Sequence, residues 1–173
     1  MTIDIGDVAI IRSYQFTNIG YTLVNKGNPA DASGTIHSVE IYAVAGHNLT
    51  NVVVGTFYTT NGNTLKCRDS AVIGTVASGS KQIITEDSES NPLAIAVESG
   101  DYIGIYYAEG WLYWDDTGFS GTWYKLGQYA DPGDEITYSM SPGGAISLYG
   151  EGEEPAKPAA GGGPAVLVAA GII

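Results

Sequence analysis

Aromatic side chains and carboxylates stand close together in one part of the sequence, a combination suited to binding sugars. All three Trp residues of the chain belong to this set: Trp111, Tyr113, Trp114, Asp115, Asp116, Trp123 and Tyr124. An exposed indole or phenol ring stacks on the apolar face of a sugar, and a nearby carboxylate accepts hydrogen bonds from its hydroxyls. Large aromatic residues also dominate cores and interfaces, so packing is the simpler role for the same residues.

A second group has the chemistry of a calcium site. Asp131, Asp134 and Glu135 place three carboxylates on the turn around Pro132-Gly133, and Ca²⁺ takes about six to eight oxygen ligands. No segment has the spacing of an EF-hand loop. Charged runs are commonly solvated, so calcium is one of two interpretations of this turn, and no other cofactor is expected.

Residues that could catalyse a reaction are scattered. Carboxylate pairs can cleave glycosides, but 19 Asp and Glu residues make chance pairing easy. His37 and His47 have no evident nucleophile beside them, and residues 118–122 lack the second glycine of a nucleophile elbow. Cys67, the only cysteine, has no basic partner that the sequence identifies. We therefore predict a protein that is not an enzyme, with a glycan-cleaving enzyme as the third hypothesis.

Short segments rich in Val, Ile, Thr and Tyr must position these residues, with turn residues between them. Strands are predicted over residues 21–25, 35–44, 51–60, 64–67, 71–76, 94–97, 101–108, 112–114, 122–125 and 145–149. Asn61-Gly62 predicts a hairpin turn, and imperfect alternation around His37, over residues 36–41, predicts a bulge or partial burial on both faces. No window has helical periodicity. The chain is predicted to be all-β, a β-sandwich with a jelly roll as the expected topology and an immunoglobulin-like arrangement as the alternative.

The charge of the chain excludes some classes of partner. The formal net charge is −12, and only seven Lys and Arg residues are present. Nucleic-acid binding requires clustered cations, and an anionic membrane surface would repel this chain. The first residues, Met1 to Asp7, have neither a basic region nor a long apolar run, so no signal peptide is expected.

The composition changes at Gly150, where we expect the domain of residues 1–150 to end. Residues 151–164 form an acidic linker rich in Pro and Gly, and residues 165–173 form an apolar arm. The arm is too short to cross a bilayer, and its large apolar side chains are Val166, Leu167, Val168, Ile172 and Ile173. An exposed apolar strand is prone to aggregation. The arm is therefore predicted to dock on a neighbouring subunit, with folding back on its own domain as the alternative.

Several motifs give the first 150 residues a resemblance to a known class of protein. They are Asp4-Ile5-Gly6, Asn28-Pro29-Ala30, Ser33-Gly34-Thr35-Ile36, the strand over residues 100–106, and the ending over residues 145–150. In motifs and order the chain resembles β-sandwich modules of phage and metagenomic virion proteins. The resemblance implies a concanavalin-like or jelly-roll fold and a role in capsid decoration or tail fibres. It carries no catalytic signature.

Together these observations predict a virion structural protein. We expect it to be made in the host cytoplasm, to form a homo-oligomer, and to decorate and stabilise a capsid at the virion surface in contact with a capsid or tail protein. Symmetric assembly would cover its strand edges. A carbohydrate-binding, lectin-like adhesion module is the alternative, with a glycan as the partner.

Overall fold

The computed structural model describes residues 1–161, and this part of the chain folds into fifteen β-strands without a helix. A five-stranded antiparallel sheet has the order β1-β15-β4-β7, with β8 also paired to β4. Its strands are β1 (Thr2–Asp7), β15 (Leu148–Glu153), β4 (Gly34–Tyr42), β7 (Lys81–Ile84) and β8 (Ile95–Val97).

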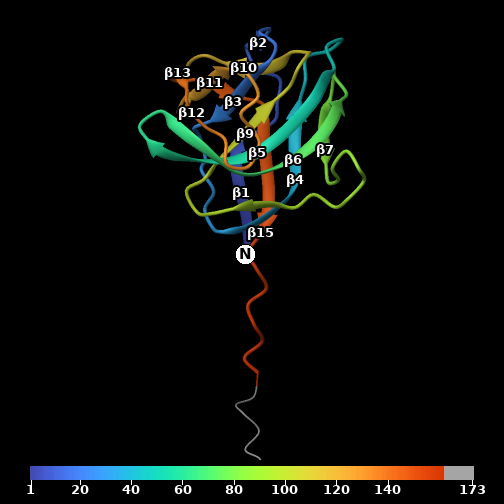
Figure 1. Cartoon of the computed structure of the whole chain (residues 1–173). Helices are drawn as coiled ribbons and strands as arrows, with labels where there is room; N and C mark the ends of the chain where they lie inside the picture. Colours follow the sequence, from blue (N-terminus) through green and yellow to red (C-terminus); the bar gives the residue numbers. More distant parts are fainter. Residues whose placement is uncertain (162–173) are drawn as a thin grey trace, which may run out of the picture.

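The second sheet has seven strands in the order β12-β6-β5-β9-β3-β11-β13, and all its pairs are antiparallel. These strands are β12 (Glu135–Thr137), β6 (Thr64–Val76), β5 (Leu49–Asn61), β9 (Tyr102–Tyr106), β3 (Tyr21–Asn25), β11 (Thr122–Leu126) and β13 (Ser139–Ser141). A small third sheet is made of β14 (Ala145–Ile146), β10 (Leu112–Asp115) and β2 (Tyr14–Phe16). The predicted all-β sandwich is confirmed (Figure 1).

The main core is made by alternate residues of facing strands. Ile3 and Ile5 of β1, Ile41 of β4 and Leu23 of β3 are fully buried in it. A second cluster, which includes Val24, Phe57, Leu65 and Trp123, lies on the opposite face of the seven-stranded sheet. Alternation places successive residues on opposite faces, so the central strands of this sheet are apolar on both sides.

The central strand β9 agrees with its sequence pattern. Ile103, Gly104 and Ile105 are successive buried residues, as expected for a strand covered on both faces. Ala in place of Gly104 would bring its Cβ to 2.6 Å from Phe57 Cε2 and 2.9 Å from the Leu23 carbonyl oxygen. The absence of a side chain at position 104 therefore lets β5 and β3 approach β9 closely.

Two local predictions have clear outcomes. The bulge around His37 is confirmed, because Ser38 pairs with Glu151 and Ile36 with Gly152, which leaves His37 without a partner in β15. The hairpin between β5 and β6 is present but turns one residue later than predicted. Asn61 pairs with Thr64, so the turn residues are Gly62 and Asn63. The positive φ of Gly62, 61°, is what a type II′ turn requires at that position.

The ends of several elements differ from the sequence prediction. β6 is one strand where two were predicted over residues 64–67 and 71–76, and β1, β2, β7, β12 and β13 were not predicted. β15 continues past Gly150 to Glu153, so it includes acidic residues that were expected to belong to the linker. Residues 154–161 form no strand or helix and extend away from the sandwich (Figure 1). The predicted arm residues Val166, Leu167, Val168, Ile172 and Ile173 lie outside the described residues.

Candidate functional site

A concavity lies between the small sheet and one end of the seven-stranded sheet, and we call it the aromatic groove. Its volume is about 540 Å³. Residues of β2, β3, β10, β11 and β13 contribute to its lining: Gln15, Phe16, Thr17, Asn18, Tyr21, Leu23, Trp114, Thr122, Tyr124, Met140, Ser141, Pro142 and Ile146. Four of these side chains are aromatic, and no Asp, Glu, Lys, Arg, His or Cys is among them. The groove is therefore an uncharged, ring-lined surface.

The aromatic rings of the groove form a continuous row. Phe16 packs edge-on against Trp114 on one side and against Tyr21 on the other, both with ring centroids 5.8 Å apart. Tyr21 lies 6.5 Å from Tyr124, and the row continues outside the groove to Tyr14, 6.3 Å from Trp114. These separations are those of interacting aromatic pairs. The four groove rings are half-buried against the core, so each also keeps part of its surface open to a ligand.

Strand pairing brings these rings together from distant parts of the sequence. β2 pairs with β10, which puts Phe16 opposite Leu112, and β3 pairs with β11, which puts Leu23 opposite Tyr124. The small sheet is then tied to the seven-stranded sheet by Asn25, a fully buried residue. Its side-chain amide donates to the Ile146 and Leu148 carbonyls, both at 3.1 Å, and accepts from the Ile146 N–H at 2.9 Å.

The predicted aromatic residues do not form one site. Trp114 and Tyr124 lie in the groove, whereas Trp123 is a core residue with its ring 4.9 Å from that of Tyr102. Trp111 stacks on His47 with centroids 3.5 Å apart, and Tyr113 packs edge-on against Tyr42. Trp114 and Tyr113, which are adjacent in β10, thus take different surroundings, as alternation in a strand requires. For Trp123 the simpler expectation, core packing, is the one that holds.

The predicted carboxylates have other roles or none. Asp115 is paired with Arg12 at 3.1 Å and accepts a hydrogen bond from the Ser13 N–H at 2.9 Å. Although burial raises the pKa of the Asp115 carboxyl, the hydrogen bonds from Ser13 and Arg12 outweigh it, and the pKa is lowered overall. Asp115 is therefore held by the protein and is not free to bind a sugar. Asp116 follows β10 and is not part of the groove lining.

The acidic turn proposed for calcium is closed by its own hydrogen bonds. The Asp134 carboxylate accepts from the Asp131 N–H at 3.1 Å, and Asp131 accepts from the Gln128 amide at 2.9 Å. Glu135 begins β12, opposite Lys66 of β6. Within residues 1–161 no three His, Cys, Asp or Glu side chains form a group that could hold a metal ion. The arrangement gives the calcium prediction no support.

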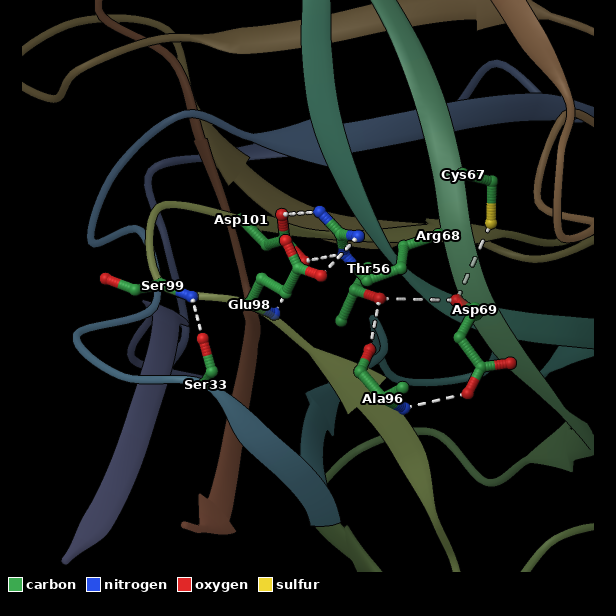
Figure 2. Close-up of polar contacts among 9 residues, drawn as sticks. All are labelled: Ser33, Thr56, Cys67, Arg68, Asp69, Ala96, Glu98, Ser99 and Asp101. Carbon is green, nitrogen blue, oxygen red and sulfur yellow. Dashed lines mark hydrogen bonds and ion pairs between the residues drawn. The ribbon is translucent and has the colours of Figure 1, made fainter. Parts of the chain in front are cut away.

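A polar cluster surrounds β8 and the turn that joins it to β9 of the other sheet, and its contacts are structural (Figure 2). Arg68 of β6 contacts Asp101 with two side-chain nitrogens, one of them at 3.0 Å, and Glu98 at 3.1 Å. The Asp69 carboxylate accepts from the Ala96 N–H at 2.7 Å. Thr56 donates its hydroxyl to the Ala96 carbonyl at 2.7 Å. Side chains of the seven-stranded sheet thus anchor β8, which pairs with the other sheet.

Cys67 is not a reactive thiol in this fold. The residue is 1% exposed, and its Sγ contacts the Asp69 carbonyl at 3.6 Å. Burial, together with the carboxylates of Asp134, Asp69 and Asp131, raises the pKa of the Cys67 thiol to about 12. A nucleophilic cysteine needs the opposite shift.

Sequence reasoning missed half of the groove rings. Phe16 lies in a three-residue strand, which is too short for alternation to be read from the sequence. Tyr21 begins a predicted strand, but nothing near it in the sequence indicates that it meets Phe16 and Tyr124. The aromatic residue type at both positions was the only available signal.

Comparison with known proteins does not identify this groove. No model of a known protein family, no curated protein and no solved structure matches the sequence or the fold. Within the described residues no helix is long and apolar enough to cross a membrane. The function must therefore be inferred from the groove and its surroundings.

Proposed function

We propose that this chain is a non-enzymatic structural protein that assembles with copies of itself, as a virion module on a capsid or tail would. The observation that carries the proposal is a group of large exposed apolar side chains beside the aromatic groove. Ile10, Ile11, Tyr14 and Phe119 are between 42% and 62% exposed, and we call them the apolar rim. Soluble monomers seldom gather such side chains without an interaction that covers them.

The apolar rim and the aromatic groove are continuous. Arg12 links Phe119 to the rest of the rim, because its guanidinium lies 4.9 Å from the Phe119 ring centroid and Ile10, Ile11 and Tyr14 lie within two residues of it in the chain. Tyr14 in turn packs near Trp114 of the groove. Aromatic residues are enriched, and charged residues depleted, at the centre of protein interfaces. This end of the sandwich has that composition.

Two further observations support a structural role on a particle. The groove lining has no carboxylate, imidazole, thiol or amine, so its Ser, Thr and Tyr hydroxyls have no such group among the lining residues to activate them. The resemblance of the first 150 residues to virion β-sandwich modules supports a position at a virion surface, with a capsid or tail protein as a further partner.

Light scattering after gel filtration, over a range of concentrations, tests the self-assembly. Full-length protein should have a mass above the 18.1 kDa of one chain, and Ile11→Asp should lower it. Ile83→Asp is a matched control, because Ile83 has the same exposure of 62% but lies on β7, away from the rim. A monomer at every concentration, or an equal effect of the two substitutions, would contradict the proposal.

Glycan binding is the second candidate, and the row of rings in an uncharged groove favours it. Ring faces stack on sugars, and Gln15 and Asn18 of the lining both donate and accept hydrogen bonds. Titration with neutral oligosaccharides, followed by Trp fluorescence and calorimetry, tests it. Binding should be lost in Trp114→Ala and kept in Trp111→Ala, whose ring lies outside the groove. No heat and no fluorescence change across the panel would exclude this candidate.

A further inference from the structure

The segment after the last strand has the properties of a polyproline II ligand. Pro155 and Pro158 are separated by Ala156 and Lys157, and the chain from Pro155 to Gly161 is exposed and in no strand or helix. A polyproline II helix has three residues per turn and leaves its backbone without internal hydrogen bonds. The two prolines would therefore share one edge of such a helix, with free carbonyl oxygens between them.

The aromatic groove has the matching properties. Polyproline II segments are recognised by grooves lined with aromatic rings, which receive the proline edge. Phe16, Tyr21, Trp114 and Tyr124 provide a row of rings at spacings of 5.8 to 6.5 Å. The indole N–H of Trp114 and the hydroxyls of the two tyrosines can donate hydrogen bonds to free backbone carbonyls. Pro142 adds a further apolar surface to the lining.

The segment cannot reach the groove of its own chain. The groove residue Ile146 closely precedes β15, and the segment follows the far end of the same strand. β15 has six residues, so about 17 Å separates its first residue from its last at roughly 3.4 Å per step. Pro155 follows Glu153 by two residues, which span only about 7 Å even when extended. Figure 1 shows the segment leaving beside the N-terminus, at the end opposite β2 and β10.

Charge also favours a contact between copies. Lys157 is the only charged residue from Pro155 to Gly161, and the chain as a whole carries a net charge of −12. Glu153 and Glu154 directly precede the segment, so the attraction to the acidic body of another copy comes from Lys157 alone. Because no charged side chain lines the groove, binding of the uncharged residues of the segment buries no ion of the groove and carries no cost of desolvating one.

We infer that the aromatic groove of one copy binds the Pro155–Pro158 segment of a second copy. The inference rests on the proposed self-assembly and identifies the contact through which it occurs. Because the groove and the segment lie at opposite ends of the sandwich, the contact is head-to-tail. Such contacts form a ring when the rotation between copies closes, and an open chain when it does not.

The test is a mixing experiment with full-length variants, measured by light scattering after gel filtration. Pro155→Ala/Pro158→Ala removes the proline edge from an exposed segment without strand structure, so the body stays folded. Trp114→Ala removes a groove ring but keeps the segment, and Tyr124→Ser is a second groove variant should Trp114→Ala unfold. Each variant alone should lose assembly, with at least about a tenfold weaker association, as for other truncated interface anchors.

A mixture of the two kinds of variant separates groove–segment binding from contacts made elsewhere on the chain. A 1:1 mixture of the proline variant and a folded groove variant should form heterodimers of twice the 18.1 kDa chain mass, because one supplies an intact groove and the other an intact segment. Assembly of the proline variant at the wild-type level, or a mixture that stays monomeric, overturns the inference while self-assembly stands. Loss of assembly only on removal of residues 165–173 overturns it too and assigns the contact to the apolar arm. A wild-type chain that is monomeric refutes the proposed function itself.

Discussion

Asp115→Leu should destabilise the fold strongly, because Asp115 neutralises a buried arginine. The Arg12 side chain is 1% exposed and that of Asp115 is 15% exposed. Arg12 also donates to the Ser147 hydroxyl at 3.0 Å and to the Val8 carbonyl at 2.8 Å. Removal of one partner of a buried ion pair costs about 3–5 kcal/mol, since a buried charge is left without compensation. The two remaining acceptors of Arg12 place the expected loss near the lower end, about 3 kcal/mol.

Urea unfolding of a double-mutant cycle measures this loss. Arg12→Met/Asp115→Leu should cost clearly less than the sum of the two single substitutions, because no unpaired charge remains. Asp116→Asn is a control on the adjacent residue and should change the free energy of unfolding by less than about 0.5 kcal/mol. The reasoning is refuted if Asp115→Leu costs under about 1 kcal/mol, or if the two single effects simply add.

The same pair predicts a pH dependence with a definite sign. The folded-state pKa of Asp115 lies below its ordinary value, so the unfolded chain takes up a proton there first as the pH falls. The stabilisation is therefore complete above about pH 4, the ordinary pKa of an aspartate, and is lost as the pH falls through the folded-state pKa. As the pH falls below about 4 and through the folded-state pKa, Asp115→Leu should show a smaller loss of stability than the wild type, to the extent that this residue contributes.

Three further predictions concern the core. Trp123→Ala should cost about 3–5 kcal/mol in urea unfolding, since Trp123 is 2% exposed, and a loss no larger than that of Trp111→Ala would be inconsistent with a core role. Gly104→Ala should cost about 1–3 kcal/mol by overpacking, and an unchanged thermal midpoint would mean that Phe57 and its neighbours move freely. Cys67, whose thiol pKa is raised to about 12, should not react with a thiol reagent at about pH 8 until urea unfolds the protein. Its contribution to stability should be complete below about pH 8.5, the ordinary thiol pKa, and be lost as the pH rises from there through the folded-state pKa.

The strands that the sequence identifies are those whose pattern is local. β3 was predicted with its observed bounds, and β9 lies within the strand predicted over residues 101–108, because apolar residues and turn glycines mark them. In β1, Ile3 and Ile5 alternate clearly and are fully buried, so the sequence does carry a signal for this strand. β2 and β13 are three residues long, which is too short for any periodicity to appear. Their existence depends on the longer strands beside them.

The groove could be predicted only in part, since it depends on contacts between distant segments. Trp114 and Tyr124 were identified as candidates by residue type. The sequence could not decide which of Trp123 and Tyr124 faces the core, because alternation separates them but both are aromatic. Asp115 was considered as a ligand for sugar hydroxyls. Its actual partner, Arg12, lies far away in the chain, so nothing in the sequence indicated the pairing. Cross-sheet partners of this kind have no local signature in one sequence.

The acidic charge and the apolar end of the molecule are compatible with specific assembly. Copies with a net charge of −12 repel one another in most orientations, which limits non-specific association of the exposed rim. The groove carries no charge, so contact there does not bring like charges into a water-free interface. The segment from Pro155 to Gly161 has one lysine and no acid, so it adds no like charge to a contact with another copy. In the proposed assembly, repulsion between acidic surfaces elsewhere favours contact through the groove and this segment.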